Sequence, residues 1–361
     1  MVADIGVSRF DAGQVTGQTE TQTTHLLEMI GTSWMTQAIS VAAELHLADL
    51  LADGRQEIDA LASAAQCEPT SLHRLLRALT SLDLFTEHDD GSFSLTPAGT
   101  LLCTDAPQSL RSWAIWCGQY HWPLWGNLLA CVKSGVSARE LVTGTQAYAH
   151  IENNPHSALI FNQAMVEITR LIAGELAKVI DFSPARHAVD IGGGHGVLLA
   201  KILAAQPHLR GTLFDLPHAV AGASAMMSNA DVAMRCEIAT GSFFDAVPAG
   251  ADVYLLKSIL HNWNDEKCLA ILCNCRRAMS ADASLILVER IMPARLCASS
   301  VDRAIARSDL NMLVGLAGRE RTAAEFTALL AVSGFKVMRI RPVTLDYSAI
   351  VAVPDLQVPI P

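Results

Sequence analysis

Residues 190–196 read Asp190-Ile191-Gly192-Gly193-Gly194-His195-Gly196, after a short apolar run and before a helical pattern at residues 197–205. A glycine turn between a strand and a helix lets the backbone approach a ligand closely at the carboxyl end of the strand. Dinucleotide-binding folds carry similar glycines, and a tight turn without a ligand would show the same residues. The motif therefore predicts a Rossmann-like unit and leaves its ligand open.

From residue 186 onward, short apolar strands alternate with helical patterns. The expected strands are residues 187–191, 212–214, 253–256, 284–288, 336–340 and 349–353. This alternation is typical of an α/β fold in which helices cover both faces of a doubly wound parallel sheet. We expect this Rossmann-like catalytic domain to cover residues 181–361.

The N-terminal third has a different pattern. Apolar residues recur at helical spacing over residues 35–51, 58–65 and 72–82, and a hairpin with the turn His88-Asp89-Asp90-Gly91 follows. This order is typical of a winged helix-turn-helix. The remaining expected segments are a flexible N-terminus at residues 1–20, the winged-helix-like domain at 21–105 and a Trp-rich helical segment at 106–180.

A winged helix can bind DNA, but the charge of this one argues against it. Residues 40–105 hold three basic side chains against eleven acidic ones, a balance of −8, where phosphate contacts need a positive face. The prediction is therefore an α-helical winged-helix dimerisation domain with no nucleic-acid partner.

Composition sets the class of protein. Hydrophobic residues make up 51% of the chain and charged ones 17%, which indicates a globular protein with apolar surface to spare for a homodimer interface. The longest apolar runs fall well short of the roughly 20 residues that span a bilayer, so no membrane partner is expected. The N-terminus lacks the blocks of a secretory signal, and nine cysteines without a CxxC pair suggest reduced thiols and a cytoplasmic protein.

Asp215 ends the second strand, 25 residues after Asp190, in Leu213-Phe214-Asp215-Leu216-Pro217. A carboxylate at this place can accept both ribose hydroxyls of an adenosyl group. NAD and S-adenosylmethionine fit equally well up to this point. The segment Lys257-Ser258-Ile259-Leu260-His261-Asn262-Trp263, after the fourth strand, favours S-adenosylmethionine.

Along nearly its whole length the chain resembles the plant caffeate-type and bacterial natural-product O-methyltransferases, a family that includes hydroxyneurosporene methyltransferase-like enzymes. The shared motifs, in the family's order, are the glycine loop, Phe214-Asp215-Leu216-Pro217, Gly241-Ser242-Phe243-Phe244, Lys257, His261 with Trp263, Val288-Glu289, Asp309-Leu310-Asn311-Met312-Leu313 and Gly318-Arg319-Glu320-Arg321-Thr322. The segment Phe161-Asn162-Gln163-Ala164-Met165 also fits the helix that closes the family's pocket.

The resemblance implies that His261 removes the proton from a substrate hydroxyl while Glu289 and Glu320 flank its ring. A phenol with a pKa near 10 keeps its proton at neutral pH, whereas a histidine near 6.5 is unprotonated often enough to accept it. A neighbouring carboxylate orients the imidazole and stabilises the imidazolium that forms. The implied cofactor is S-adenosylmethionine, with S-adenosylhomocysteine as the product.

The resemblance also implies a binding site around the base. The predicted cofactor residues are Asp190, Gly192, Gly194, Asp215, Leu216, Ser242, Phe243, Lys257 and Trp263. The predicted substrate residues are Trp125, Phe161, Met165, Asn262 and Met312, partly supplied by the helical segment at 106–180. No metal ligands are expected.

Two positions depart from the family's pattern. Ser242 stands where many relatives have an aspartate that accepts the adenine amino group, which predicts weaker recognition through the serine oxygen. Asn262 stands where many relatives have aspartate, and loss of that charge lowers the pKa of His261 if the side chain lies close to it.

The predicted function is methylation of a phenol, enol or polyketide hydroxyl on a small secondary metabolite. One alternative is a relative that binds the cofactor but catalyses a pericyclic step or a decarboxylation, and another is N- or C-methylation. A ligand-sensing DNA regulator and an NAD oxidoreductase are disfavoured by the acidic winged helix and by the His-Asn-Trp motif. A metal-dependent mechanism would have to assemble Asp245, Asp252 and Asp265.

Overall fold

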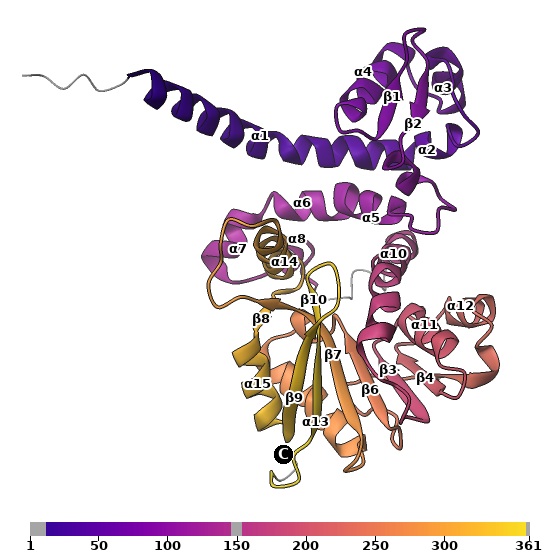
Figure 1. Ribbon diagram of the computed structural model, residues 1–361, viewed down its shortest axis with the longest axis vertical. Helices are drawn as coiled ribbons and strands as arrows, with labels where there is room; N and C mark the ends of the chain where they lie inside the picture. Colours follow the sequence, from indigo (N-terminus) through magenta and orange to yellow (C-terminus); the bar gives the residue numbers. More distant parts are fainter. Residues whose placement is uncertain (1–11, 146–153, 359–361) are drawn as a thin grey trace, which may run out of the picture. The chain divides into compact units, whose positions relative to one another are not determined.

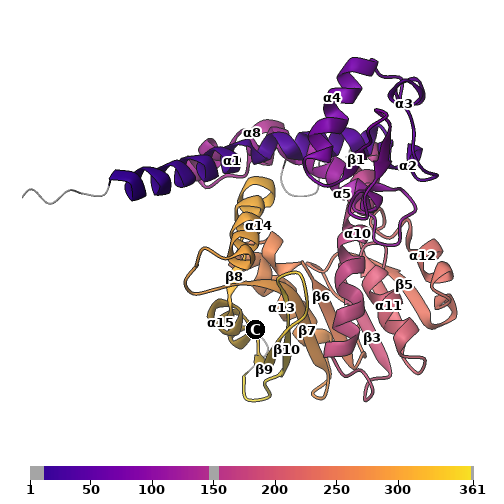
Figure 2. The ribbon, with the colours of Figure 1, turned by 45° about the horizontal axis from the view of Figure 1, so that its top comes forward.

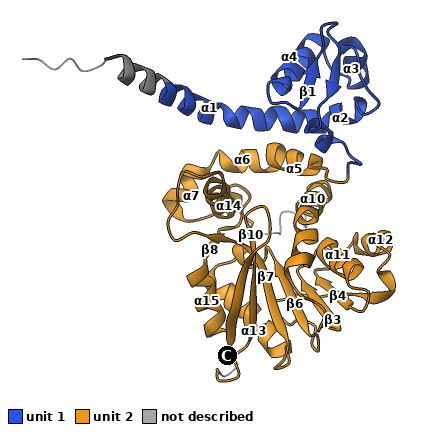
Figure 3. Cartoon of the chain, in the orientation of Figure 1, with its two compact units in different colours: residues 1–106 blue, residues 107–361 orange. Residues whose placement is uncertain are grey.

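The computed structural model describes residues 12–145 and 154–358. The chain divides into two compact units, residues 1–106 and 107–361 (Figure 3). The helical segment expected at 106–180 lies almost wholly within the second unit and has no separate compact body. Within the described residues, no helix is both long enough and apolar enough to cross a membrane.

The first unit has the order of elements expected for a winged helix. Its elements are α1 (Ala12–Glu44), α2 (Leu47–Leu50), α3 (Ile58–Ala64), α4 (Pro69–Thr80), β1 (Phe85–Glu87), β2 (Phe93–Leu95) and the 3-10 helix η1 (Gly99–Leu102). Helix α4 starts at a proline, and the side chain of Glu68 accepts hydrogen bonds from the amides of Thr70 and Ser71. Its apolar face packs on the antiparallel β1–β2 hairpin.

Helix α1 differs from the sequence expectation at both ends. It begins at Ala12, so part of the stretch expected to be flexible is helical, while residues 1–11 lie outside the described residues. The single helix expected at 35–51 is broken at His46, whose φ of 54° is left-handed. A backbone in that region cannot continue a right-handed helix, so α2 starts as a separate turn.

The second unit is built on an eight-stranded sheet with the strand order β5-β4-β3-β6-β7-β10-β9, to which β8 adds beside β7 (Figure 1). The strands are β3 (His187–Ile191), β4 (Arg210–Asp215), β5 (Cys236–Thr240), β6 (Val253–Lys257), β7 (Ser284–Met292), β8 (Arg321–Thr322), β9 (Phe335–Pro342) and β10 (Tyr347–Pro354). Strands β3 to β7 run parallel, which confirms the Rossmann-like fold class.

The expectation of a wholly parallel sheet was wrong for its last two strands. Strand β10 pairs antiparallel with both β7 and β9. Only residues 343–346 connect β9 to β10, and a connection this short joins antiparallel neighbours, whereas a parallel pair needs a long crossover. The sequence analysis did not predict strand β5, because the exposed residues Glu237 and Thr240 interrupt its apolar run.

Helices cover both faces of the sheet (Figures 1 and 2). One core layer lies under α10 (Pro155–Val179), α11 (Val197–Ala205) and α12 (Ala223–Asn229), and the other under α13 (Asp265–Ala278) and α15 (Ala323–Val332). Leu255 faces the first layer and Leu256 the second, because successive side chains of a strand alternate between faces. The remaining helical pieces are α5 (Arg111–Ile115), the π-helical turn η2 (Trp116–His121), α6 (Trp122–Trp125), α7 (Leu128–Ser134), α8 (Ala138–Thr143), the 3-10 turns η3 (Ala233–Arg235) and η4 (Leu260–Asn262), and α14 (Ser300–Leu316).

The strand order indicates at which edge of the sheet a ligand should bind. Strand β3 has β4 on one side and β6 on the other, so the direction of winding reverses between β3 and β6. Ligands of open α/β sheets bind beside the carboxyl ends of the strands at such a point. Asp190, Asp215 and Lys257 all stand at or next to those ends.

Candidate active site

The glycine turn after β3 forms the floor of a cavity. Gly192 has a φ of 70°, and a Cβ at this position would lie 2.5 Å from Cδ1 of Ile259. A side chain would therefore be strained and would collide with the turn that follows β6. Glycine here keeps the carboxyl end of β3 open to a ligand.

Asp215 is held by the backbone of this turn. Its Oδ2 accepts from the amide of Gly194 at 2.8 Å, and its Oδ1 accepts from the amide of Leu216 at 2.7 Å. Burial raises the pKa of Asp215, and these two hydrogen bonds oppose that effect. The carboxylate is thus fixed in place before any ligand arrives.

Asp190 is the second acidic group of this site and is only 1% exposed. Burial and the negative charge of Asp215 raise its pKa to about 7, against the opposing effect of Lys257. Within the described residues, its Oδ2 has no hydrogen-bond partner. Two neighbouring acids, of which the buried Asp190 has an orphaned oxygen, fit a ligand that carries positive charge.

A cavity of about 360 Å³ opens over these residues. This volume lies within the range of small-molecule sites. All the predicted cofactor residues line it, together with three predicted substrate residues, namely Asp190, Gly192, Gly194, Asp215, Leu216, Ser242, Phe243, Lys257, Trp263, Phe161, Met165 and Asn262. The lining also includes residues that the sequence analysis did not select, among them Thr169, His195 and His218. His195 lay within the quoted glycine motif, whereas nothing in the sequence singled out Thr169.

Lys257 lies at the end of β6 and lines the cavity. Its Nζ donates to Oγ1 of Thr169 on α10 at 3.1 Å, which ties the helix to the end of the strand. Its positive charge lowers the pKa of Asp190. Lys257 therefore partly balances the charge of Asp190.

Ser242 also faces the cavity, and its Oγ accepts from the amide of Phe244 at 3.2 Å. The rings of Phe243 and Phe244 pack edge to face, with 4.9 Å between centroids, and Phe244 packs in the same way on Trp263 at 5.0 Å. These rings give the cavity an apolar aromatic wall beside the serine.

Two predicted substrate residues lie outside this cavity. Nε1 of Trp125 donates to Oδ1 of Asn311 at 3.1 Å, and the ring packs in a separate apolar cluster around Val314. Met312 is buried and does not line the cavity. Their contact with substrate stays a prediction, because aromatic and Met side chains fill cores as readily as pockets.

The aromatic support of the cavity comes instead from η2. The ring of Trp116 lies 5.0 Å from that of Phe161 and stacks on Tyr120 at 4.8 Å. Nε1 of Trp116 donates to Nε2 of His121 at 2.7 Å, and burial lowers the pKa of this histidine to about 4. The neutral histidine therefore fixes the tryptophan that backs Phe161.

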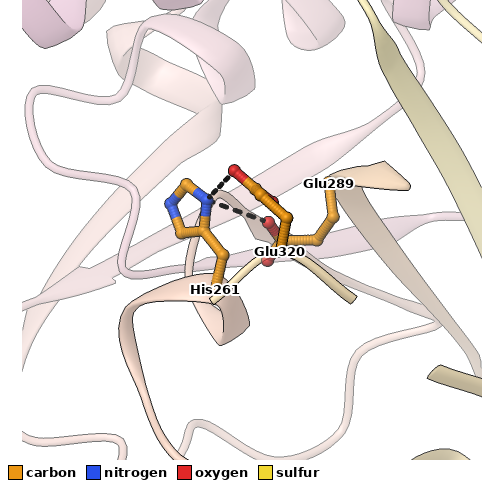
Figure 4. A group of neighbouring side chains, drawn as sticks. All are labelled: His261, Glu289 and Glu320. Atoms are coloured by element: carbon orange, nitrogen blue, oxygen red, sulfur yellow. Dashed lines mark hydrogen bonds and ion pairs between the residues drawn. The ribbon is translucent and has the colours of Figure 1, made fainter. Parts of the chain in front are cut away.

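His261 lies in η4, directly after β6, and is 6% exposed. Its Nδ1 is 3.1 Å from Oε1 of Glu320 and 3.8 Å from Oε2 of Glu289, and the other ring nitrogen points away from both carboxylates (Figure 4). A carboxylate can only accept at Nδ1, so Nδ1 carries the proton and Nε2 is left as the basic nitrogen. Ile259 and Asn262, beside His261 in the chain, line the cavity, while His261 and the two glutamates are not part of its lining.

The two carboxylates control the protonation of His261. Burial alone would lower the pKa of His261, but the charges of Glu289 and Glu320 outweigh it and raise the pKa above its ordinary value. Burial works against the charged form of Glu320, yet the nearby His261 keeps the pKa of Glu320 below its usual range. The pair therefore favours an imidazolium beside a carboxylate, as expected of a base that has just taken up a proton.

Glu289 has a different task from Glu320. Its Oε1 accepts from the amides of Ile259 at 3.0 Å and Leu260 at 2.8 Å, so it holds the backbone in front of His261. Burial raises the pKa of Glu289. Asn262 closes the same turn, because its Nδ2 donates to the carbonyl of Ser258 at 3.0 Å.

Two neighbours on α14 hold Glu320. Ser308 donates from its Oγ to Oε1 of Glu320 at 2.6 Å, and Oδ1 of Asp309 accepts from the amide of Glu320 at 2.8 Å. The sequence analysis quoted the motif that begins at Asp309 but did not select Ser308. A serine inside a helix carries no pattern that separates it from an exposed one.

The aspartates considered for a metal site do not gather. Asp252 accepts from the amides of Arg186 and His187, and Asp265 pairs with Arg319 and Arg321. Asp252 and Asp265 thus have structural partners of their own, Asp245 is exposed, and the three do not form a group that could hold a metal ion among the described residues. That version of a metal-dependent mechanism has no support from the described residues.

Family comparisons and relatives agree with this geometry. Residues 27–105 match an O-methyltransferase dimerisation domain, and residues 125–336 match an O-methyltransferase domain. The phenazine O-methyltransferase PhzM of Lysobacter antibioticus is 39% identical over 330 residues, which are 91% of this chain and 95% of the relative. The mitomycin biosynthesis 6-O-methyltransferase of Streptomyces lavendulae is 36% identical over 313 residues, 86% of this chain and 88% of the relative. An 8-amino-8-demethylriboflavin N,N-dimethyltransferase of Streptomyces davaonensis is 33% identical over 305 residues, 83% of this chain and 86% of the relative.

Solved structures agree as well. The crystal structure of LaPhzM matches with a TM-score of 0.88 at 39% identity, over 92% of this chain and 99% of that one. NcsB1 from neocarzinostatin biosynthesis, in complex with S-adenosylmethionine and 2-hydroxy-5-methyl naphthoic acid, matches with a TM-score of 0.75 at 30% identity, over 89% of this chain and 96% of that one. The predicted family, fold class and cofactor are thereby confirmed. The chain belongs to the O-methyltransferase family, whose cofactor is S-adenosylmethionine and whose dimerisation domain it carries.

Proposed function

We propose that this chain methylates a hydroxyl on a small, flat aromatic secondary metabolite, with His261 as the general base. The observation that carries the proposal is the buried contact of 3.1 Å between Nδ1 of His261 and Glu320, which leaves Nε2 basic. Phe161, which lines the cavity and is backed by Trp116, supports a flat substrate. Both O-methyltransferase relatives described above act in natural-product chemistry, which points to the same substrate class.

Asp190 and Asp215 would hold the cofactor, with Leu216, Ser242 and Phe243 beside it. S-adenosylmethionine supplies a methyl group on a sulfonium, so that the group is already activated for transfer. The orphaned oxygen of Asp190 fits such a cationic ligand. Lys257 would complete this side of the site and limit the excess of negative charge.

His261 performs the proton transfer. Its Nε2 would take the proton of the substrate hydroxyl as the oxygen displaces S-adenosylhomocysteine from the methyl carbon, and Glu320 would stabilise the imidazolium. Glu289 keeps the turn in place through its two backbone hydrogen bonds. Phe161, Met165 and Asn262 would position the substrate, which supplies the rest of the rate increase by orientation.

The first test is isothermal titration with S-adenosylhomocysteine of the wild type and of Asp215→Ala. Binding to the wild type that weakens strongly in the variant is the expected result. A panel with a monocyclic phenol, a naphthol and a hydroxyphenazine is then assayed for methyl transfer, with His261→Ala alongside. Loss of about 10²-fold or more in kcat is expected for His261→Ala. Full activity of this variant, or a wild type that binds no S-adenosylhomocysteine, would refute the proposal.

N-methylation is the second function to test, since one relative is an N,N-dimethyltransferase. A neutral aromatic amine attacks through its lone pair and gives up its proton later, so it depends less on a base. Amine and hydroxyl versions of one ring should therefore respond differently to His261→Ala. Faster methylation of the amine than of the hydroxyl by the wild type, with only a small loss for the amine in His261→Ala, would favour N-methylation.

Two controls test the alternatives to this proposal. One addresses a metal-dependent route, and the other an enzyme that binds the cofactor without transferring a methyl group. Among the described residues, His261, Glu289 and Glu320 form the one cluster close enough to hold a metal ion. Activity that survives EDTA supports the proposed base. Consumption of substrate without a methylated product would support a pericyclic or decarboxylating reaction.

The dimerisation domain confirms the predicted homodimer. Helix α1 exposes a group of large apolar side chains, which we infer a second copy covers, namely Leu26, Leu27, Met29, Ile30 and Trp34. Sedimentation of the full chain and of Trp34→Glu tests this inference. The variant should dissociate at a higher concentration than the wild type does.

We also propose that the protein works in the cytoplasm. All nine cysteines are free, which suits a reducing compartment. Cell fractionation followed by immunodetection tests this location.

A further inference from the structure

Arg321 is a fully buried arginine that the mechanism above does not use. Its Nη1 donates to the carbonyl of Leu260 at 2.8 Å and its Nη2 to the carbonyl of Trp263 at 2.7 Å. One guanidinium therefore spans the turn that carries His261. Nε and Nη2 also donate to Oδ1 of Asp265, at 3.0 and 2.7 Å. Taking a guanidinium out of water is costly, and this arrangement offsets the cost only because its donors are satisfied.

The opposite end of the turn carries the opposite charge. Glu289, also fully buried, accepts from the amides of Ile259 and Leu260. The amides at the start of a helical turn bear partial positive charge, and the carbonyls at its end bear partial negative charge. Glu289 and Arg321 thus complement the two ends of η4, with His261 between them.

The loop that ends at Arg321 also packs directly on the His261 turn. The amide of Arg319 donates to the carbonyl of His261 at 2.9 Å. A Cβ at Gly318 would fall on that carbonyl oxygen, so the two backbones meet without a side chain between them. Glu320 lies between Arg319 and Arg321, and the same loop therefore delivers it to Nδ1.

We propose that Arg321 is a positioning residue, which fixes the His261 turn against the Glu320 loop and so sets the contact that orients the base. This inference rests on the proposed function of His261. Arg321 does not line the cavity, so it acts through His261 and not on the cofactor or the substrate. A lysine here would keep the charge but could not reach two carbonyls and a carboxylate at once, because it lacks the planar fork.

The test is Arg321→Lys, measured first by NMR on protein labelled with ¹³C at the histidine Cε1. The resonance missing from His261→Ala belongs to His261, so its titration is followed without any substrate. The groups that face His261 are Glu289, Glu320 and Arg290. All three remain in Arg321→Lys, and a change in the titration therefore reports geometry. We expect the pKa of His261 to fall toward its ordinary value as the contact with Glu320 loosens.

The kinetic prediction for Arg321→Lys is a drop of about tenfold or more in kcat per cofactor-binding site. Sites are counted by titration with S-adenosylhomocysteine, whose Kd should stay within about twofold of the wild type. Counting sites in this way separates a misplaced base from a smaller fraction of folded protein.

Arg235→Lys is the matched control. Arg235 also donates to backbone carbonyls, those of Leu203, Gln206 and Leu209, beside the start of β4 and so at the opposite end of the sheet. This variant should lose stability yet keep the kcat and the pKa of His261.

Gly318→Ala serves as a second variant, without a charge change. Its Cβ must displace the carbonyl of His261, so the pKa of His261 should fall here too. If Arg321→Lys binds S-adenosylhomocysteine and leaves both the pKa and kcat unchanged, or if both variants fail to fold, Arg321 only supports the fold and the inference is wrong. Full activity of His261→Ala would instead overturn the proposed base.

Discussion

Ser308 donates a hydrogen bond of 2.6 Å to Oε1 of Glu320, the same oxygen that faces Nδ1 of His261 at 3.1 Å. Two donors therefore converge on one carboxylate oxygen. The hydrogen bond from Ser308 is one of the effects that lower the pKa of Glu320. It helps to keep this glutamate charged in a buried place and aimed at the histidine.

Ser308→Ala should lower kcat by about tenfold, because a hydrogen bond to a charged group contributes roughly 1.5 to 3 kcal/mol and part of that is lost when Glu320 is less well held. The matched control is Ser333→Ala, which removes a buried hydroxyl that donates to the carbonyl of Leu329 at 2.9 Å. The control should lower the melting temperature without a comparable change in kcat. Equal kcat in both variants would argue against a role for Ser308 at the base.

Glu320→Gln should change the pH profile as well as the rate. The neutral imidazole is the active form, and its fraction grows as pH rises through the pKa of His261. Glu289 and Glu320 raise that pKa against the effect of burial, so removal of one charge lowers it. The rising limb of kcat against pH should therefore move to lower pH, while the plateau falls by roughly 10²-fold. An unchanged limb would mean that Glu320 does not govern the protonation of the base.

Much of this site could be predicted from the sequence, for a topological reason. Asp190, Asp215, Lys257 and Glu289 lie in or next to strands that run parallel, and the carboxyl ends of such strands meet at one edge of the sheet. Local pattern is enough to place residues of this kind. The positive φ of Gly192 belongs to the same local information.

The rest depends on packing between segments that are far apart in sequence. Trp125 and Met312 were predicted to contact substrate, yet neither lines the cavity, and no periodicity distinguishes a pocket wall from a core. Ser308 and Arg321 were missed as functional residues because their importance arises from contacts with Glu320 and with the turn after β6. The antiparallel pairing of β9 with β10 could have been predicted, because the connection between them is too short for a parallel crossover, whereas the placing of β10 beside β7 depends on long-range packing.

Asp190→Asn should make cofactor affinity less dependent on pH. The pKa of Asp190 is raised to about 7 by burial and by Asp215, so below that pH the group is protonated and must lose its proton to face a cationic ligand. The affinity of the wild type for S-adenosylmethionine should therefore fall as pH drops below 7, with a limiting slope of about tenfold per unit for one proton.

Isothermal titration in buffers of different ionisation enthalpy counts the protons released. The variant should bind more weakly at pH 8 and release fewer protons at pH 6. His195 and His218 also line the cavity, and both remain in the variant, so the comparison isolates the change at residue 190. A variant that keeps the full proton release would show that Asp190 is not the linked group.

Ser242→Asp introduces the carboxylate that the family resemblance implies after β5. Ser242 lines the cavity, and its Oγ already accepts from the amide of Phe244, a bond that an aspartate oxygen can also make while its second oxygen faces the ligand. A charged acceptor forms a stronger hydrogen bond to an amino group than a hydroxyl does. We expect the variant to bind S-adenosylhomocysteine about three- to tenfold more tightly. The inosine analogue, which has no amino group on its base, should gain nothing, and an equal gain for both ligands would mean that the added charge acts on the sulfur or amino acid end and not on adenine.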